Sequence, residues 1–173
     1  MMTDTKKEHD DCSYCERLWT QFHIDRERGI NGLVCDRHGL PWNQRAVCLY
    51  IVQDGHVLAV TRGHGPGSEN DWGLPGGKVE ETDVDDVKAA ARELREETGY
   101  ILDESSAIPI FTKKVHKYTC TTYAGRVTNR IEYDPREGVV AWVLPTTLLI
   151  PGSTFVDYNS ELLRRIGALR YGS

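Results

Sequence analysis

The sequence predicts a mixed α/β fold that follows a small N-terminal metal-binding module, on the basis of three observations. Apolar and β-branched residues are enriched over residues 46–62 and 107–145, as expected for strands. Residues 84–98 and 159–170 show helical spacing instead, so strands come first, then a helix, more strands and a closing helix. That order is typical of a layered fold in which a mixed sheet lies between helices. Paired cysteines mark residues 1–43 as a separate unit.

The N-terminal segment contains two pairs of soft metal ligands. Cys12 and Cys15 form a C-x2-C, and Cys35 with His38 forms a C-x2-H, with nineteen residues between the pairs. Two such pairs supply the four donors of a structural zinc ion, and a closed four-ligand site leaves no open position for chemistry. The alternative is a set of reduced thiols beside a surface histidine. We expect residues 1–43 to be a Cys3His zinc-binding module and residues 44–173 to be a second, larger domain.

Composition excludes several classes of partner. The formal net charge of −5 gives no general attraction to nucleic acid or to acidic membranes. No apolar run reaches the roughly 18 residues of a membrane helix, and the N-terminus lacks the apolar core of a signal peptide. The five cysteines are an odd number, which suits a reducing compartment. We therefore expect a cytoplasmic protein with no membrane or nucleic-acid partner.

The second domain begins with a predicted hairpin and continues through a glycine-rich loop. Residues 46–52 and 56–62 read as strands, joined by the turn signal Asp54-Gly55. A loop over residues 63–81 then leads to the most strongly helical part of the chain. Either Asp83 or Asp85 can cap that helix, and Gly99 can end it.

The helix carries three glutamates in the stretch ARELREETGY. Glu93, Glu96 and Glu97 lie three and four residues apart, so they share one face and repel one another. A divalent cation such as Mg²⁺ or Mn²⁺ would convert that repulsion into ligation, and a main-chain carbonyl of Gly76 could complete its shell. Arg92 would sit beside the acids as a neutralising partner. The alternative is an ordinary solvated acidic face.

The segment from Gly77 to Tyr100 resembles the Nudix box, whose pattern is G-x5-E-x7-R-E-U-x-E-E-x-G-U with U an apolar residue. Residues 92–100 match that half completely, and LPGGKVE at 74–80 resembles the usual lead-in. The resemblance covers about residues 44–170 and implies an α/β/α sandwich. One departure stands out, because Asp83 replaces the first glutamate and eight residues rather than seven separate it from Arg92. Asp83 could brace the loop against the helix, as that glutamate does, or cap the helix instead.

The resemblance implies Mg²⁺-dependent hydrolysis of a nucleoside diphosphate linked to a group X, by attack of water at phosphorus. Gly76, Glu93, Glu96 and Glu97 would hold the metal, and Glu93 is a ligand or the base for the water. Glu137, with Glu132 as second choice, would add an acid from outside the box, unless both are plain loop residues. Arg62 and Lys78 are candidates for phosphate contact or ordinary surface cations. A homodimer is compatible with the resemblance, although the sequence locates no interface.

The substrate is less well defined by the sequence. A (deoxy)nucleoside triphosphate, as for MutT-like enzymes, is the broadest fit for a short chain without a specificity insert. Tyr118 lies where dinucleoside polyphosphate hydrolases often carry a tyrosine and could stack on a base, or simply pack in a strand with Tyr123. The zinc module resembles that of NADH pyrophosphatases, whose downstream signature is missing. RNA-cap hydrolysis and a non-catalytic nucleotide sensor also remain open, although such sensors usually lack the glutamates kept here.

Overall fold

The computed structural model describes residues 44–61, 68–80, 82–115, 118–133 and 138–167. The predicted zinc ligands Cys12, Cys15, Cys35 and His38 lie outside these residues, so the zinc module remains a prediction. Within the described part, helices are too short or too polar to cross a bilayer.

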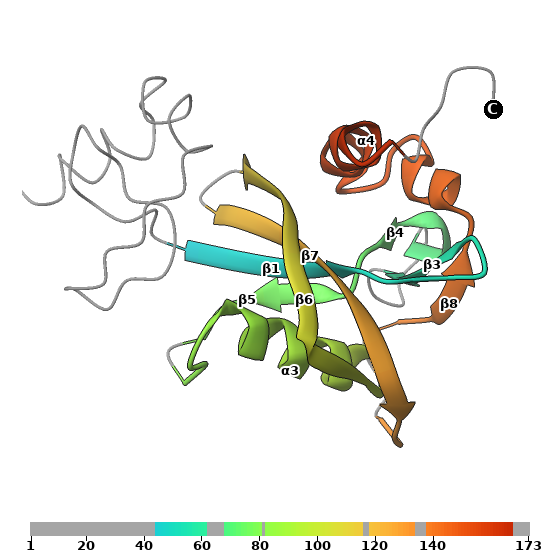
Figure 1. The fold of residues 1–173 in the computed structure, drawn as a ribbon. Helices are drawn as coiled ribbons and strands as arrows, with labels where there is room; N and C mark the ends of the chain where they lie inside the picture. Colours follow the sequence, from blue (N-terminus) through green and yellow to red (C-terminus); the bar gives the residue numbers. More distant parts are fainter. Residues whose placement is uncertain (1–43, 62–67, 81, 116–117, 134–137, 168–173) are drawn as a thin grey trace, which may run out of the picture.

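The larger sheet is mixed and has β1 (Gln44–Tyr50) in its interior. Its four strands follow the order β5-β1-β7-β6. β1 pairs antiparallel with β5 (Gly76–Lys78) and parallel with β7 (Tyr118–Arg130). β7 then pairs antiparallel with β6 (Tyr100–Val115), and together they form the long curved ribbon seen in Figure 1.

The smaller sheet contains the turn and the second strand of the predicted hairpin, but residues 46–50 of its predicted first strand belong to β1 of the larger sheet. β2 (Val52–Gln53) pairs antiparallel with β3 (His56–Thr61), which also pairs with β4 (Trp72–Gly73) and β8 (Val140–Val143). Asp54 and Gly55 make the turn with φ values of 50° and 75°. Positive φ at both central positions is the geometry of a two-residue hairpin whose twist matches its strands.

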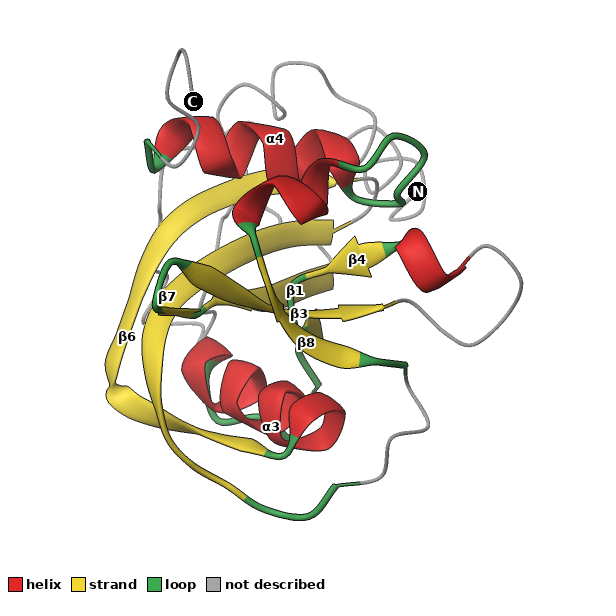
Figure 2. Cartoon of the chain, turned by 90° about the vertical axis from the view of Figure 1, so that its right-hand side faces the viewer, coloured by secondary structure: helices red, strands yellow, loops and turns green. Residues whose placement is uncertain are grey.

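Two helices cover opposite sides of the strands, as Figure 2 shows. Helix α3 (Asp86–Thr98) lies on one side and α4 (Val156–Arg165) on the other, with short 3-10 turns at Ser68–Asn70 and Pro145–Leu149. Because side chains alternate along a strand, β1 feeds both layers. Val47 packs in the core cluster against α3, whereas Cys48 packs in the cluster with α4. The predicted α/β architecture, with a mixed sheet and helices, is confirmed.

The ends of α3 agree with the sequence. Asp85, not Asp83, caps the helix, since its carboxylate accepts a hydrogen bond from the Lys88 N–H at 2.7 Å. Gly99 ends it with φ 77°, and its N–H donates to the Arg95 carbonyl. An added Cβ at Gly99 would collide with the Ile131 carbonyl oxygen, so both the conformation and the close approach require glycine here.

Candidate active site

The two glycines of β5 allow its backbone to lie close to strand β1 and to helix α3. Gly76 lies opposite Cys48 in the β-ladder, and a Cβ at Gly76 would come within 2.6 Å of the Cys48 Cα. Gly77 faces the other way, and a Cβ there would lie 2.5 Å from Glu93 Oε1. These contacts hold the loop backbone directly against β1 on one side and the acidic helix on the other.

Arg92 joins the loop to the helix. Its Nε and Nη2 each donate to the Asp83 carboxylate at 3.0 Å, a two-pronged ion pair. Nη2 also donates to the Lys78 carbonyl oxygen at 3.1 Å. On the helix, Nη1 donates to Glu93 at 3.0 Å and to Glu96 at 3.3 Å. We call this group the acidic junction; its members are Asp83, Arg92, Glu93, Glu96 and Glu97.

Asp83 therefore braces the loop rather than capping the helix. Besides its pair with Arg92, its Oδ2 accepts from the Glu80 N–H at 2.8 Å. The hydrogen bond from Arg92 lowers the pKa of Asp83, and the same pair raises the pKa of Arg92. The shorter side chain and the extra residue of this Nudix-like box thus still allow the contact to Arg92.

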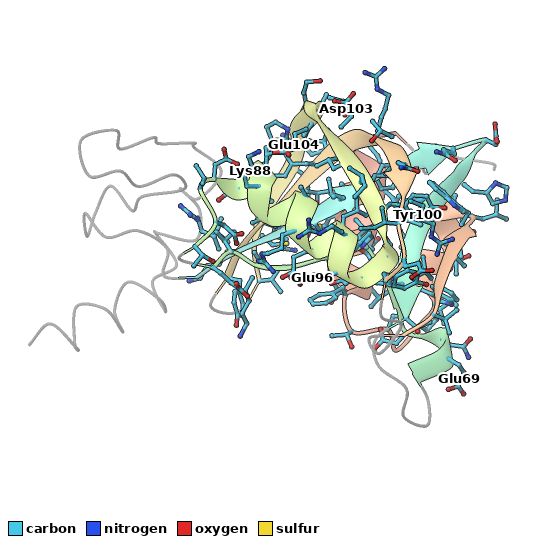
Figure 3. All side chains as sticks on the ribbon, turned by 90° about the horizontal axis from the view of Figure 1, so that it is seen from below. Glu69, Lys88, Glu96, Tyr100, Asp103 and Glu104 are labelled. Carbon is cyan, nitrogen blue, oxygen red and sulfur yellow. The ribbon has the colours of Figure 1, made fainter. Side chains whose placement is uncertain are left out.

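The three glutamates share a helix face but take different positions. Glu93 is half-buried beneath Gly77, and burial raises the pKa of its carboxyl group, while the charge and the hydrogen bond of Arg92 oppose the rise. Glu97 Oε2 accepts from the Gly76 N–H at 3.3 Å. The Glu96 side chain is 54% exposed and lies on the solvent-facing surface of α3, where it is labelled in Figure 3. Together they place one carboxylate beneath the loop, one beside it and one at the solvent edge.

These groups fit a hard divalent cation. Among the described residues, no three His, Cys, Asp or Glu side chains converge closely enough to form a metal site unaided. Nevertheless, Glu93 and Glu97 both lie against the β5 backbone, and Glu97 affects the pKa of Glu93. Backbone of Gly76 and Gly77 approaches the same two side chains. Two carboxylates with water and phosphate oxygens are the donor set that magnesium prefers.

A cavity of about 680 Å³ opens beside the acidic junction. Gly76, Gly77 and Glu97 form part of its wall, and β1, β3, β7 and α4 supply much of the rest. Its volume lies within the range of typical small-molecule sites. The helix with the acids and the strands of the sheet thus contribute to one continuous site.

Two predicted substrate-binding residues meet in the wall of this cavity. Lys78 and Tyr118 both line it, with the Lys78 Nζ 5.4 Å from the centre of the Tyr118 ring. Hydrogen bonding to Tyr118 raises the pKa of Lys78, which keeps the ammonium charged. Tyr123 is on the opposite face, in the core against α3, because it lies five positions after Tyr118 and strand side chains alternate.

The other side of the cavity is built from uncharged groups, which we call the neutral network: Cys48, Cys120, Thr122 and Tyr158. The Thr122 hydroxyl is 3.0 Å from Cys48 Sγ and 2.6 Å from the Tyr158 hydroxyl. Burial raises the pKa of Tyr158, and a hydrogen bond with Cys120 followed by burial raises the pKa of Cys48. The same hydrogen bond lowers the pKa of Cys120, so bonding and burial favour the neutral forms of Cys48 and Tyr158 but not that of Cys120.

Two predicted site residues, Arg62 and Glu137, lie outside the described residues and stay predictions. Glu132 is described and exposed, and it is not among the residues that line the cavity. Helix α4 also contributes to the cavity, which the sequence did not indicate: Phe155 at its N-cap and Tyr158 and Asn159 within it line the wall. Their spacing of three and four residues is the available signal, since it places them on one helix face.

Comparison with known proteins agrees with this geometry. The family model described as NUDIX domain matches residues 42–162. A MutT NUDIX hydrolase from Burkholderia pseudomallei has a similar structure, with a TM-score of 0.54 and 23% identity over 69% of this chain and 97% of that one. A NUDIX hydrolase from Nitrosomonas europaea reaches a TM-score of 0.60 at 16% identity, covering 88% of both chains.

An ADP-ribose pyrophosphatase from Streptococcus suis is also similar, with a TM-score of 0.56 and 17% identity over 75% of this chain and 94% of that one. A search of curated protein sequences finds no match. At these identities, the structural similarities establish a shared fold.

Proposed function

Because the chain belongs to the NUDIX family and is a hydrolase of phosphoanhydride bonds, we propose that it is a Mg²⁺-dependent pyrophosphohydrolase of (deoxy)nucleoside triphosphates. The observation that carries this proposal is the continuity between the acidic junction and the 680 Å³ cavity, with Glu97 belonging to both. One region suits the pyrophosphate and its metal, and the adjoining region has the volume for a nucleoside.

The acidic junction would hold the cation through Glu93, Glu96, Glu97 and the Gly76 carbonyl. When bound, Mg²⁺ supplies charge neutralisation on the phosphates and a lowered pKa for a coordinated water. Glu93 is the candidate to accept a proton from the attacking water, since it is half-buried and held beneath Gly77. Arg92 keeps Glu93 in place while also bonding the loop.

The cavity would hold the nucleoside and the outer phosphates. Lys78 presents a cation on the same wall as Glu97, where the phosphates would pass. The neutral network provides a surface without net charge on the far side, which suits a base and a sugar better than a phosphate. Glu137 remains our candidate for an additional acid, and Arg62 for an additional phosphate contact.

A substrate panel tests the proposal. Purified protein with Mg²⁺ would be incubated with dNTPs, oxidised dGTP, ADP-ribose, NADH, diadenosine tetraphosphate and capped RNA, and products separated by chromatography. We expect triphosphates to give a monophosphate and pyrophosphate, and ¹⁸O-labelled water to show which phosphorus is attacked. Preferential cleavage of ADP-ribose or another alternative would replace the proposed substrate. Binding without cleavage across the panel would favour a nucleotide sensor.

We further propose that residues 1–43 bind structural zinc through Cys12, Cys15, Cys35 and His38. The paired spacing of these ligands supports this proposal. Metal analysis of the purified protein should find stoichiometric zinc, and Cys35→Ser should lose it while Cys120→Ser retains it. Absence of zinc from protein expressed in zinc-supplemented medium would contradict the proposal.

A further inference from the structure

Lys78 and Tyr118 come from strands that are not neighbours. Lys78 ends β5 and Tyr118 begins β7, with β1 running between them. Lys78 is paired with Ala46 of β1, and Ala46 is paired with Cys120 of β7, two residues beyond Tyr118. Because alanine has only a methyl side chain, the long lysine can pass over β1 and reach the tyrosine ring.

Lys78 and Tyr118 border the part of the cavity that the phosphate chain of a bound nucleotide would occupy. Lys78, Tyr118, Gly76 and Glu97 all line the same cavity. The lysine backbone is fixed from the other side, since its carbonyl oxygen accepts a hydrogen bond from Arg92 at 3.1 Å. With the main chain held by Arg92 and the ammonium 5.4 Å from the ring centre, both ends of the lysine are constrained.

The nature of the partner determines what the lysine can do. A carboxylate partner would neutralise the ammonium, and Glu97, which lines the same cavity, is the acidic side chain that could offer that alternative. An aromatic ring attracts a cation through its electron-rich face but adds no charge. The ammonium held by Tyr118 therefore keeps its full positive charge for an incoming anion.

We propose that Tyr118 is a positioning residue, which holds the Lys78 ammonium at the cavity wall so that it meets the phosphate chain of the substrate already oriented. This inference rests on the proposed function. It assigns Tyr118 a role acting through Lys78 and the phosphates, in place of stacking on the nucleobase. Lys78, positioned in this way, would recognise a nucleoside polyphosphate. The contact would be to the phosphate chain and would not depend on the base.

A double-mutant cycle separates these two roles. KM and kcat would be measured with dGTP and dTTP for wild type, Lys78→Met, Tyr118→Leu and the double variant. We expect Lys78→Met to raise KM about tenfold, the size of one charge-assisted contact. Tyr118→Leu should raise KM several-fold for both nucleotides with little change in kcat. In the Lys78→Met background, loss of the ring should have no further effect.

Conservative replacement provides the matched control. Tyr118→Phe retains the ring face but loses the hydroxyl that hydrogen-bonds Lys78, so its KM should lie between those of wild type and Tyr118→Leu. Additive effects in the cycle, or a loss in Tyr118→Leu that is much larger for dGTP than for dTTP, would overturn the inference in favour of base stacking. Thermal unfolding of each variant checks that the fold is kept.

A spectroscopic measurement covers the case in which Tyr118→Leu does not fold. The Tyr118 ring should shift the NMR signals of the Lys78 ε-methylene protons upfield in wild type and in Tyr118→Phe. Ordinary lysine shifts in wild type would contradict the pairing. If wild type hydrolyses no nucleoside triphosphate at all, the proposed function fails; if it does and the cycle is additive, only this inference fails.

Discussion

The two sides of the candidate site are built from opposite chemistry. The acidic junction joins loop and helix through Arg92, which contacts the carboxylates of Asp83, Glu93 and Glu96. The neutral network joins β1, β7 and α4 through hydrogen bonds between a thiol and two hydroxyls, and it contains no acidic or basic side chain of the Asp, Glu, Lys or Arg type. Charge is thus concentrated where phosphate and metal would react, and absent where a nucleoside would bind. The comparison predicts that charge-removing variants impair chemistry, whereas changes in the network mainly affect packing.

Glu97→Gln should have the largest effect. The substitution keeps the shape of the side chain but removes the charge that a divalent cation requires. We expect kcat to fall by at least about 10²-fold, as for the loss of a group that acts on the reacting atoms. Glu104→Gln is the matched control. Glu104 of β6 forms an ion pair with Lys88 of α3, and Figure 3 shows these two residues side by side and apart from Glu96. Full activity in Glu97→Gln would remove Glu97 from the reaction.

Arg92→Ala should have the largest effect on stability. The Arg92 side chain is only 18% exposed, and its loss leaves the carboxylates of Asp83 and Glu93 close together without a cation. We expect the free energy of unfolding in urea to fall by about 3 kcal/mol. Arg126→Ala, which removes a 79% exposed arginine, should cost less than about 0.5 kcal/mol. Equal losses in the two variants would contradict the central position given to Arg92.

The pH dependence of stability in Asp83→Asn tests whether the ionised Asp83 carboxylate stabilises the acidic junction. Because Arg92 lowers the pKa of Asp83 in the folded state, its ionised form stabilises the protein above the ordinary aspartate range, near 3.9. That contribution is lost as the pH falls through the lowered value. We expect Asp83→Asn to cost about 1–2 kcal/mol at pH 7 and progressively less below pH 4, in urea unfolding. A difference that grows on acidification would mean that the sign of the interaction is wrong.

Tyr158→Phe should have the smallest effect. It removes one hydroxyl from the neutral network, which leaves Thr122 with Cys48 as its remaining partner. We expect a loss of about 1 kcal/mol in unfolding free energy that does not change with salt concentration. In the same variant kcat should stay within about twofold, since no ionised group is altered. A fall in kcat comparable to that of Glu97→Gln would show that the two sides are not separable.

The two sides also differ in how far the sequence could predict them. The acidic junction is local: all its members lie within Asp83–Glu97, so helix spacing and the resemblance to the box were enough to identify them. The sequence left open whether Asp83 braces or caps, and the structure resolves this because Asp85 occupies the cap. The helix and most strands were predicted for the same reason, since each depends on short-range patterns.

The cavity could be predicted only in part. Lys78 and Tyr118 were singled out separately, but their contact depends on the register of β5, β1 and β7, which no local pattern specifies. Local patterns predict a loop where β4 and β5 form, because each strand has three residues or fewer and contains glycine. Neither Cys48 nor Cys120 carries a local sequence signal that marks it as part of a site. Their places in the cavity wall follow from long-range pairing alone.

The parallel pairing of β1 with β7 has a consequence for the order in which the site is made. These strands are aligned in contact from Gln44 with Tyr118 onward, more than seventy residues apart in the chain. Closing such a loop is slow compared with forming a helix. During synthesis, the segment with the acidic junction leaves the ribosome well before β7 and α4. We therefore expect the helix to form early, while a nucleotide-binding cavity appears only when the C-terminal third of the chain has docked.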